Sequence, residues 1–177
     1  MDTEGLVRAA QRGDDEAFFV LASSEKERLY RIAYAYLGNE ADALDAVQET
    51  ICRAYGKLKK LKEPRYFHTW LIRILIHCCI DERKRRHKTR TLVREWESPT
   101  TEDASPDERL ALRGAVDRLD PRFRHVIILK YYQDMTLAEI ARLLEKPEGT
   151  VKTWLHKALK QLRTIVDREG GVANGES

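Results

Sequence analysis

Side chains that can bind DNA gather on one face of a predicted helix near the end of the chain. The helix begins after Pro147, and its inward face is formed by Val151, Leu155, Ala158, Leu159 and Leu162. The opposite face carries Lys152, Thr153, His156, Lys157 and Lys160. Lysine can donate to guanine O6 and N7 or to phosphate, and threonine and histidine can bond to either. The helix start at Gly149 and Thr150 can also present backbone N–H groups to a phosphate.

A shorter predicted helix precedes this one, and the two together are typical of a helix-turn-helix. Thr136 and Glu139 form a capping box at its start. Its inward residues are Leu137, Ile140, Ala141 and Leu144. A turn of about three residues joins the helices, an arrangement that places the second helix in the DNA major groove. The alternative is an ordinary antiparallel helix pair whose basic face is only solvated.

Aromatic and cationic residues also alternate earlier in the chain, and this mixture suits single-stranded nucleic acid. Tyr66, Phe67 and Trp70 lie beside Lys62 and Arg65, and a basic run follows at residues 83–88. Unpaired bases stack on aromatic rings while Lys and Arg follow the backbone. The alternative is that the rings belong to the core. The core interpretation is favoured for Trp70, and both interpretations stay open for Tyr66 and Phe67.

Charge is distributed in blocks although the net charge of the chain is only +3. Residues 1–52 carry a net −6, residues 53–94 a net +11, residues 95–120 a net −5 and residues 121–177 a net +3. A basic block between two acidic ones predicts a face for phosphates beside faces for other partners. The alternative is a solvated helix surface.

Glycine and proline divide the chain into helices, and no period-two alternation predicts a strand. We expect helices from Asp14 to about Leu37, from Glu40 to about Leu61 and over residues 66–86. The third helix is apolar almost all round. Its polar stripe consists of Arg73, His77 and Lys84.

The predicted fold class is all-α, with two small helical domains joined by a flexible linker and a helix-turn-helix in the second. Residues 87–104 lack apolar periodicity and mix Ser, Thr and Pro with both charges. Ser105, Pro106 and Glu108 then offer a capped helix start, and Asp120 with Pro121 offers another. The expected organisation is a first domain at 1–90, a linker at 91–105, a second domain at 106–170 and a disordered tail at 171–177.

Several other classes of protein do not fit. The acidic start at residues 1–5 is no export signal, so we expect a cytoplasmic protein. The longest apolar run, residues 70–80, is far shorter than the roughly 20 residues of a membrane span. Cys52, Cys78 and Cys79 form no disulfide or zinc spacing, and we expect them to be small buried side chains. We find no catalytic nucleophile, metal site, cofactor motif or small-molecule substrate site in the pattern, and predict that the chain is not an enzyme.

Two stretches resemble a known family. Residues 42–49 (Asp-Ala-Leu-Asp-Ala-Val-Gln-Glu), residues 67–74, Asp81 and Arg83 resemble region 2 of the extracytoplasmic-function (ECF) sigma factors of bacterial RNA polymerase. Residues 119–124, 137–141, 149–153 and 158–159 resemble region 4 of the same family. The two resemblances cover most of residues 15–165, in the right order and with a linker between them.

The resemblance implies a site for each of three tasks. Residues implied to dock on the clamp helices of the polymerase are Asp42, Asp45, Gln48, Glu49 and Arg53, on a helix whose inward face is Leu44, Val47, Ile51 and Ala54. Residues implied to capture flipped bases of the −10 element are Lys62, Arg65, Tyr66, Phe67, Arg73, His77 and Lys84. Residues implied to read the −35 duplex are Thr150, Lys152, Thr153, His156, Lys157 and Lys160. The implied partners are core RNA polymerase, through its clamp helices and flap, promoter DNA, and an anti-sigma factor, which in this family is often membrane-anchored.

Two positions depart from the family pattern, and two other functions stay open. His77 stands where many members have Asn, and Trp154 where a small or basic residue is more usual, so promoter preference is not carried over. His77 also fits a plain surface histidine. One alternative function is a stand-alone helix-turn-helix regulator that binds duplex DNA as a dimer. The other is an RNA-binding adaptor that uses the aromatic and basic segment.

Overall fold

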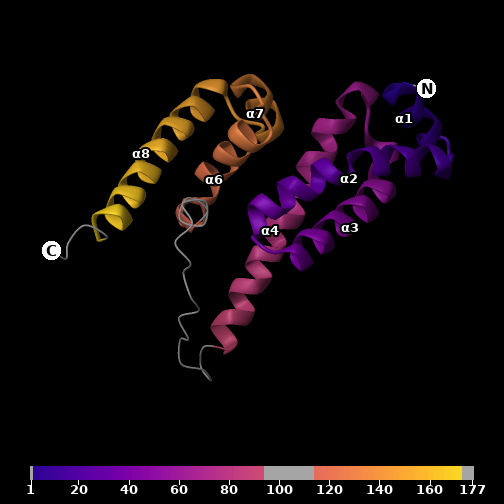
Figure 1. Ribbon diagram of the computed structural model, residues 1–177. Helices are drawn as coiled ribbons and strands as arrows, with labels where there is room; N and C mark the ends of the chain where they lie inside the picture. The colour runs from indigo at the N-terminus through magenta and orange to yellow at the C-terminus, as the bar shows by residue number, and fades with distance from the viewer. Residues whose placement is uncertain (1, 94–113, 173–177) are drawn as a thin grey trace. The chain divides into compact units, whose positions relative to one another are not determined.

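The chain is built from helices alone in the parts that the structure describes. This computed structural model describes residues 2–93 and 114–172, and no strand occurs in those ranges. The chain divides into two compact units, residues 1–97 (unit 1) and residues 98–177 (unit 2) (Figure 1). The predicted all-α fold with two helical domains is confirmed. Most of the predicted linker, residues 94–105, and the end of the predicted tail, residues 173–177, lie outside the described residues.

Unit 1 contains four α-helices and two short 3₁₀ turns. Their bounds are α1 Thr3–Gln11, α2 Asp15–Leu37, α3 Glu40–Lys57, η1 Leu58–Lys60, η2 Pro64–Tyr66 and α4 Phe67–Val93. Side chains cap three starts: Asp2 accepts from Gly5 N–H, Asp14 from Ala17 N–H and Asn39 from Asp42 N–H. The left-handed Gly38 (φ 83°) ends α2 as predicted. Helix α1 was not predicted.

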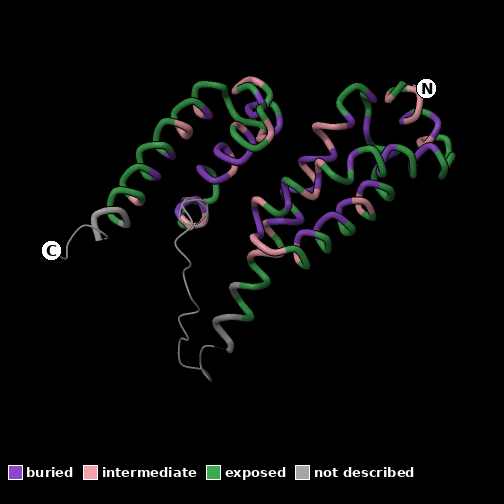
Figure 2. Tube along the Cα trace, in the orientation of Figure 1, coloured by how far each residue is buried: buried purple, intermediate pink, exposed green. Residues whose placement is uncertain are grey.

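The core of unit 1 lies where α2, α3 and α4 pack on one another (Figure 2). Its largest fully buried side chains come mainly from α2 and α4: Leu21, Leu29, Ile32, Tyr36, Phe67, Leu71, Ile72 and Leu75. Helix α3 contributes mostly small residues to this core, namely Ala43, Ala46, Val47, Thr50 and Ala54. Because this side of α3 is packed against the core, the opposite side of the helix is the one exposed to solvent.

Two predictions about α3 are corrected by its burial pattern. Leu44 was expected to face inward, but it is 40% exposed, and Ala43 takes the inward position instead. Cys52 was expected to be buried with the other cysteines, but it is exposed. Leu44 falls beside the buried stripe of Ala43, Ala46, Val47, Thr50 and Ala54. Cys52 lies on the outward side of α3, because its position along the helix is nearly opposite that stripe.

Helix α4 continues past Arg86, where we expected it to end, to Val93. The first residues of the predicted non-helical segment, 87–93, are therefore helical. Arg85 bonds to Glu82 one turn earlier (Nη2 to Oε2, 2.8 Å), and the Thr89 hydroxyl donates to the Arg85 carbonyl (3.0 Å). Lys and Arg are good helix formers, so the polar composition of this segment did not require a break.

Unit 2 contains the helix-turn-helix. Its described elements are α6 Pro121–Ile127, a π-helical turn η3 Ile128–Tyr132, α7 Leu137–Leu144 and α8 Glu148–Val172. Thr136 and Glu139 form the predicted capping box at the start of α7, and Asp120 caps α6 as predicted. The predicted capped start at residues 105–108 lies outside the described residues.

A buried arginine holds the start of unit 2 together. Arg124 is 6% exposed, and its guanidinium donates to the carbonyl oxygens of Val116 (3.2 Å), Asp117 (2.5 Å) and Leu119 (2.9 Å). These carbonyls lie where the helical residues 114–117 end, where regular helical donors run out, although Leu119 N–H also donates to the Val116 carbonyl (3.2 Å). The arginine takes that place, and nothing in the sequence pattern indicated it.

The turn between α7 and α8 contains a residue in the left-handed region. Glu145 ends α7 with φ 54°, a conformation that costs a non-glycine residue about 1 kcal/mol. We expect Glu145→Gly to raise the free energy of unfolding of unit 2 by about 0.5–1 kcal/mol. Chemical denaturation checks this, with Glu148→Gly in the first turn of α8 as the control. A loss of stability in Glu145→Gly would contradict it.

Candidate functional site

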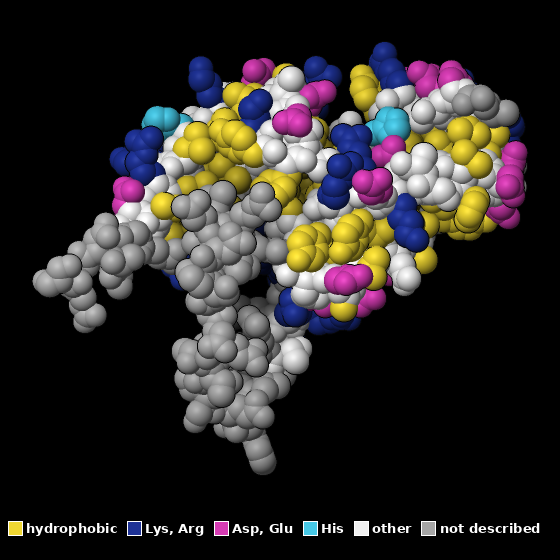
Figure 3. Space-filling model, in the orientation of Figure 1, with side chains coloured by type: hydrophobic (Ala, Val, Ile, Leu, Met, Phe, Trp, Pro, Cys, Tyr) yellow, Lys and Arg dark blue, Asp and Glu magenta, His cyan; other side chains and the backbone are white. Residues whose placement is uncertain are grey.

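The DNA-binding face predicted on α8 is present on the surface of unit 2. Lys152, Thr153, His156, Lys157 and Lys160 are all exposed, and Thr150 is half-buried at the helix start. Figure 3 shows cationic and histidine side chains standing along the outer edge of α8. The Thr153 hydroxyl donates to the Gly149 carbonyl (2.9 Å), so its oxygen can still accept from a partner.

Leu159 corrects the predicted division of α8 into two faces. It was placed on the inward side, but it is 42% exposed. It lines a shallow hollow of about 440 Å³ with His156, Lys160 and Arg163. The inward stripe predicted from helical spacing was too wide by one residue, because Ala158 and Leu162 on either side of Leu159 are buried while Leu159 lies at the edge of the covered face.

The segment between α3 and α4, residues 57–66, carries part of the surface predicted for single strands, and we call it the basic corner. Lys62, Arg65 and Tyr66 are exposed there, with Tyr66 at 43%. The Arg65 guanidinium lies 4.8 Å from the centre of the Tyr66 ring and pairs weakly with Glu63 (3.8 Å). An exposed ring beside a cation is suited to stacking on an unpaired base.

Phe67 does not belong to that surface. Its side chain is 1% exposed and lies against the rings of His68 and Trp70, with ring centres 5.9 and 6.1 Å away. A base could reach it only if the core opened, so its assignment to the −10 surface is withdrawn. Trp70, for which a core position was favoured, is half-buried.

The polar stripe predicted on α4 reaches the surface of the helix: Arg73 is half-buried, and His77 and Lys84 are exposed. His77 Nδ1 lies 2.8 Å from the Arg73 carbonyl oxygen, which orients the imidazole along the helix. When Nδ1 carries the proton and donates to this carbonyl, Nε2 is the acceptor. His77 therefore fits recognition of a base edge as well as a surface position.

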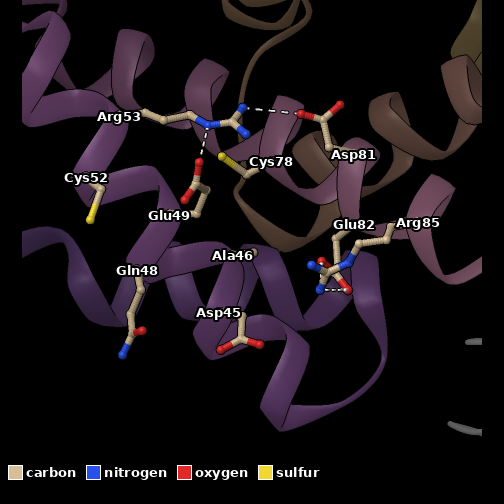
Figure 4. A pocket seen from close by; sticks show the side chains of 10 residues that line it. All are labelled: Asp45, Ala46, Gln48, Glu49, Cys52, Arg53, Cys78, Asp81, Glu82 and Arg85. Carbon is tan, nitrogen blue, oxygen red and sulfur yellow. Dashed lines mark hydrogen bonds and ion pairs between the residues drawn. The ribbon is translucent and has the colours of Figure 1, made fainter.

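A groove between α3 and α4 gathers most of the residues predicted to dock on a protein partner. It has a volume of about 590 Å³, and its lining includes Asp45, Gln48, Glu49 and Arg53 of α3 (Figure 4). Arg53 bonds to Glu49 (2.6 Å) and reaches across to Asp81 of α4 (3.2 Å). The hydrogen bond with Glu49 raises the pKa of the Arg53 guanidinium, which therefore stays charged.

Sequence reasoning missed the α4 side of this groove as a contributor. Cys78, Asp81, Glu82 and Arg85 line it from α4, and Cys52 lines it from α3. Burial raises the pKa of the Cys78 thiol, so it is a neutral lining side chain rather than a thiolate. The alternating signs of Arg53, Asp81 and Arg85 were visible in the sequence, but only the packing of the two helices brings them together.

Asp42 is placed differently from the other predicted docking residues. Its carboxylate bonds to Arg86 of α4 (2.6 Å) and accepts from the side chain of Asn39 (2.6 Å). Asp42 does not line the groove. Its interactions connect the start of α3 to the basic end of α4.

A partly buried contact between a carboxylate and a histidine joins α2 to the start of α4. Glu25 of α2 is 7% exposed, and its Oε1 lies 2.8 Å from His68 Nδ1 at the start of α4. The hydrogen bond with His68 holds the pKa of the Glu25 carboxyl below its ordinary value, against the opposite effect of burial. The pair joins α2 to the segment that carries Tyr66.

Replacing this carboxylate has a pH-dependent effect on stability. Because the folded pKa of Glu25 is depressed, its contribution is present above the unfolded value, near 4.5, and is lost as the pH falls through the folded value. We expect Glu25→Gln to lower the free energy of unfolding by about 1–2 kcal/mol near pH 6. Urea unfolding between about pH 3 and pH 6 should show the deficit shrinking below pH 4.5. The exposed Glu27→Gln is the control, and a deficit independent of pH would contradict the argument.

Other kinds of site are not found in the described ranges. Among residues 2–93 and 114–172, no group of three or more His, Cys, Asp or Glu side chains could hold a metal ion. No helix in the described part of the chain is long and apolar enough to cross a membrane.

Comparison with known proteins matches both units. A family model described as Sigma-70 region 2 matches residues 21–89, and one described as Sigma-70, region 4, matches residues 109–162. RNA polymerase sigma factor SigV of Bacillus subtilis (strain 168) is 34% identical over 150 residues, which are 83% of this chain and 89% of SigV. ECF RNA polymerase sigma factor SigW of the same strain is 28% identical over 173 residues, 89% of this chain and 92% of SigW.

A solved structure agrees with these matches. The structure of CnrH in complex with the cytosolic domain of CnrY has a TM-score of 0.71 to this chain at 25% identity. It covers 94% of this chain and 97% of CnrH. The helical unit with its groove and the unit with its helix-turn-helix thus define the class of two-domain transcription initiation factors with sigma-70 regions 2 and 4. The chain belongs to the ECF sigma factors.

Proposed function

We propose that this sigma factor docks on core RNA polymerase through the α3–α4 groove and opens promoters through the basic corner and the polar stripe of α4. Helix α8 reads the −35 element as duplex in this proposal. The observation that supports it best is that the two units carry surfaces of different kinds. Unit 1 exposes Tyr66 beside cations, which suits unpaired bases, and unit 2 exposes hydrogen-bonding side chains on the second helix of a helix-turn-helix.

The division of labour also follows from charge. The charged side chains that line the α3–α4 groove are the carboxylates of Asp45, Glu49, Asp81 and Glu82 and the guanidinium groups of Arg53 and Arg85. This net negative lining, within the acidic block of residues 1–52 and the start of α4, suits a cationic protein surface and opposes phosphates. Free protein should therefore bind promoter DNA weakly, and polymerase would supply affinity by holding the two units at the −10 and −35 elements. The chemistry of RNA synthesis would belong to the polymerase, so the chain itself is not an enzyme. Its place of action would be the cytoplasm.

The first experiment measures promoter opening. A promoter is selected from a random-sequence library by this protein mixed with core polymerase, and a fluorescent base analogue is placed in its −10 region. We expect a fluorescence rise and correctly started transcripts only when protein and core polymerase are both present. Tight duplex binding by the protein alone, with no opening after core polymerase is added, would instead favour the stand-alone regulator. RNA affinity that survives loss of residues 106–177 would favour the adaptor.

The role of α8 has its own expected result. We expect Lys152→Ala to weaken binding of the polymerase complex to −35 duplex by about 1–3 kcal/mol if Lys152 contacts a base, with relaxed specificity at one position. If Lys152 instead contacts a phosphate, binding to all duplex sequences weakens equally, and the slope of log affinity against log salt concentration becomes shallower by about 0.9. Arg168→Ala, on the exposed far part of the same helix, is the control. Unchanged affinity and slope in Lys152→Ala would remove this residue from the site.

We also propose an inhibitory protein partner of the anti-sigma type. CnrH, the structural relative, was solved with the cytosolic domain of a second protein. A partner of this kind would cover the groove and the DNA-facing residues until a signal releases them. A pull-down that recovers only polymerase subunits under every growth condition tried would count against it.

A further inference from the structure

The basic corner contains more cations than the site described above uses. Its exposed cations are Lys57, Lys59, Lys60, Lys62 and Arg65, and its only acid is Glu63. Of these five cations, only Lys62 and Arg65 were assigned to the −10 surface above. Lys57, Lys59 and Lys60 stand at the end of α3 and in η1, so they extend the cationic surface away from Tyr66 along the chain.

The corner has little regular structure of its own. Its backbone makes two short turns, in which Leu61 N–H donates to the Leu58 carbonyl and Tyr66 N–H to the Glu63 carbonyl, each at 3.0 Å. Buried Leu58, Leu61 and Pro64 anchor the segment on the core. Phe67 N–H also donates to the Pro64 carbonyl. Two 3₁₀ turns with so few backbone bonds leave much of the shape to be fixed by neighbouring elements.

Helix α1 provides that support through one side chain. The Gln11 amide nitrogen donates to the carbonyl oxygens of both Leu58 (3.0 Å) and Leu61 (2.7 Å). Both bonds are partly buried, which protects them from exchange with water. Helix α1 also contacts both η1 and η2. The region 2 family match begins only at residue 21, so α1 lies outside it.

We propose that Gln11 is a positioning residue for promoter opening, and that it holds Lys57, Lys59 and Lys60 as additional contacts for the phosphates of the opened strand. The proposal rests on the function proposed above. Phosphates follow one another along a strand, so a run of cations binds them well only when the backbone that carries the cations is already ordered. The two bonds from Gln11 order the part of the corner that bears η1.

A nucleic-acid backbone fits this surface better than a protein partner does. The corner presents five cations and one acid, and its exposed large apolar side chain is Tyr66, whereas the centre of a protein interface is depleted in charge. The unpaired bases of the opened strand can also stack on the neighbouring Tyr66 ring. Lys57, Lys59 and Lys60 would therefore follow the backbone of the same strand.

The test uses the full protein with core polymerase on the promoter selected above. Gln11→Leu keeps the size of the side chain and removes both donors, and Gln11→Lys restores a donor. Arg8→Gln, on the exposed face of α1, controls for changes in that helix, and Glu4→Gln matches the charge change of Gln11→Lys. Lys59→Ala combined with Lys60→Ala tests the cations without touching α1. Opening is followed with the base analogue at several salt concentrations, and polymerase affinity is measured separately.

We expect Gln11→Leu to slow opening about tenfold while core polymerase affinity stays unchanged, and Gln11→Lys to recover most of the rate. The salt slope of opening should become shallower by about 0.7 for each lost phosphate contact, in Gln11→Leu and in the double lysine variant. A purely structural role would lower thermal stability without changing that slope.

The outcomes separate this proposal from the one on which it rests. If the unaltered protein fails to open the promoter with core polymerase, the proposed function fails. If it opens the promoter but Gln11→Leu and the double lysine variant do so at the same rate and salt slope, only the role of Gln11 and the corner is overturned. A loss of polymerase affinity in the double lysine variant, with opening otherwise intact, would make the corner a protein-binding surface and also overturn it. If Gln11→Leu does not fold, the double lysine variant decides, because its side chains are exposed.

Discussion

Replacing Arg124 by leucine is expected to lower the free energy of unfolding of unit 2 by about 3 kcal/mol. The substitution removes the guanidinium donors that serve the carbonyls of Val116, Asp117 and Leu119, and a side chain without donors takes their place. The Val116 carbonyl keeps the backbone N–H of Leu119 as a donor. A buried carbonyl left without a donor costs about 1–3 kcal/mol, and water can reach part of this site after the change. Helix α8, which packs on α6, should then lose support without any change in its own sequence.

Hydrogen exchange resolved by mass spectrometry can assign this loss to one unit. Protection of residues 121–165 should fall by about two orders of magnitude, while protection of α2 and α3 stays the same. The control is Arg122→Leu, because Arg122 is exposed and its ion pair is a local one with Asp120, two residues before it (3.1 Å). We expect its effect to stay below about 0.5 kcal/mol. If the two substitutions lowered the free energy of unfolding equally, the buried bonds of Arg124 would contribute nothing to the stability of unit 2.

Reversing the charge of Asp45 is expected to weaken core polymerase binding about 100-fold, which corresponds to about 2–3 kcal/mol. Asp45 is exposed in the groove between α3 and α4, and it belongs to the acidic block that we propose meets a cationic partner face. Asp45→Arg places a cation where an anion is required, and the fold should be kept because the side chain is outside the core.

The measurement is a titration of labelled protein with core polymerase, followed by fluorescence anisotropy. Glu16→Arg makes the same change of charge at an exposed position of α2 and should alter the affinity by less than about threefold. Far-ultraviolet circular dichroism confirms that both variants are helical. If Asp45→Arg binds as the unaltered protein does, the groove is not the docking surface.

Most of the fold could be predicted from the sequence because its helix starts carry local signals. Asp14, Asp120 and the pair of Thr136 and Glu139 cap the helices that were expected there. Helix α1 was missed because it is short, with nine residues, and a glycine lies in its first turn. Its cap, Asp2, was present in the sequence but was considered only as part of an acidic start.

The site could be predicted only as far as helical spacing reaches. Spacing gives the direction of a side chain around its own helix, so the exposed positions on α8 and the stripe of α4 were found. It does not give the width of the neighbour that covers a face, so Leu44 and Leu159 were misplaced and the core position of Phe67 could not be decided from spacing. Bonds that join distant segments, such as those of Gln11 and Arg124, leave no periodic signal.

The basic end of α4 limits how the protein can diverge. Arg83 donates to the carbonyl oxygen of Tyr36 (2.9 Å), Arg86 pairs with Asp42, and Arg85 pairs with Glu82. These three arginines are thus bound to the fold itself, and exchanging any of them alters contacts within unit 1. Lys84 and Lys88 are exposed on the same turns and appear in none of these bonds. Substitutions can therefore be accommodated more readily at the two lysines than at the arginines beside them, and a lineage that alters Arg86 should alter Asp42 with it.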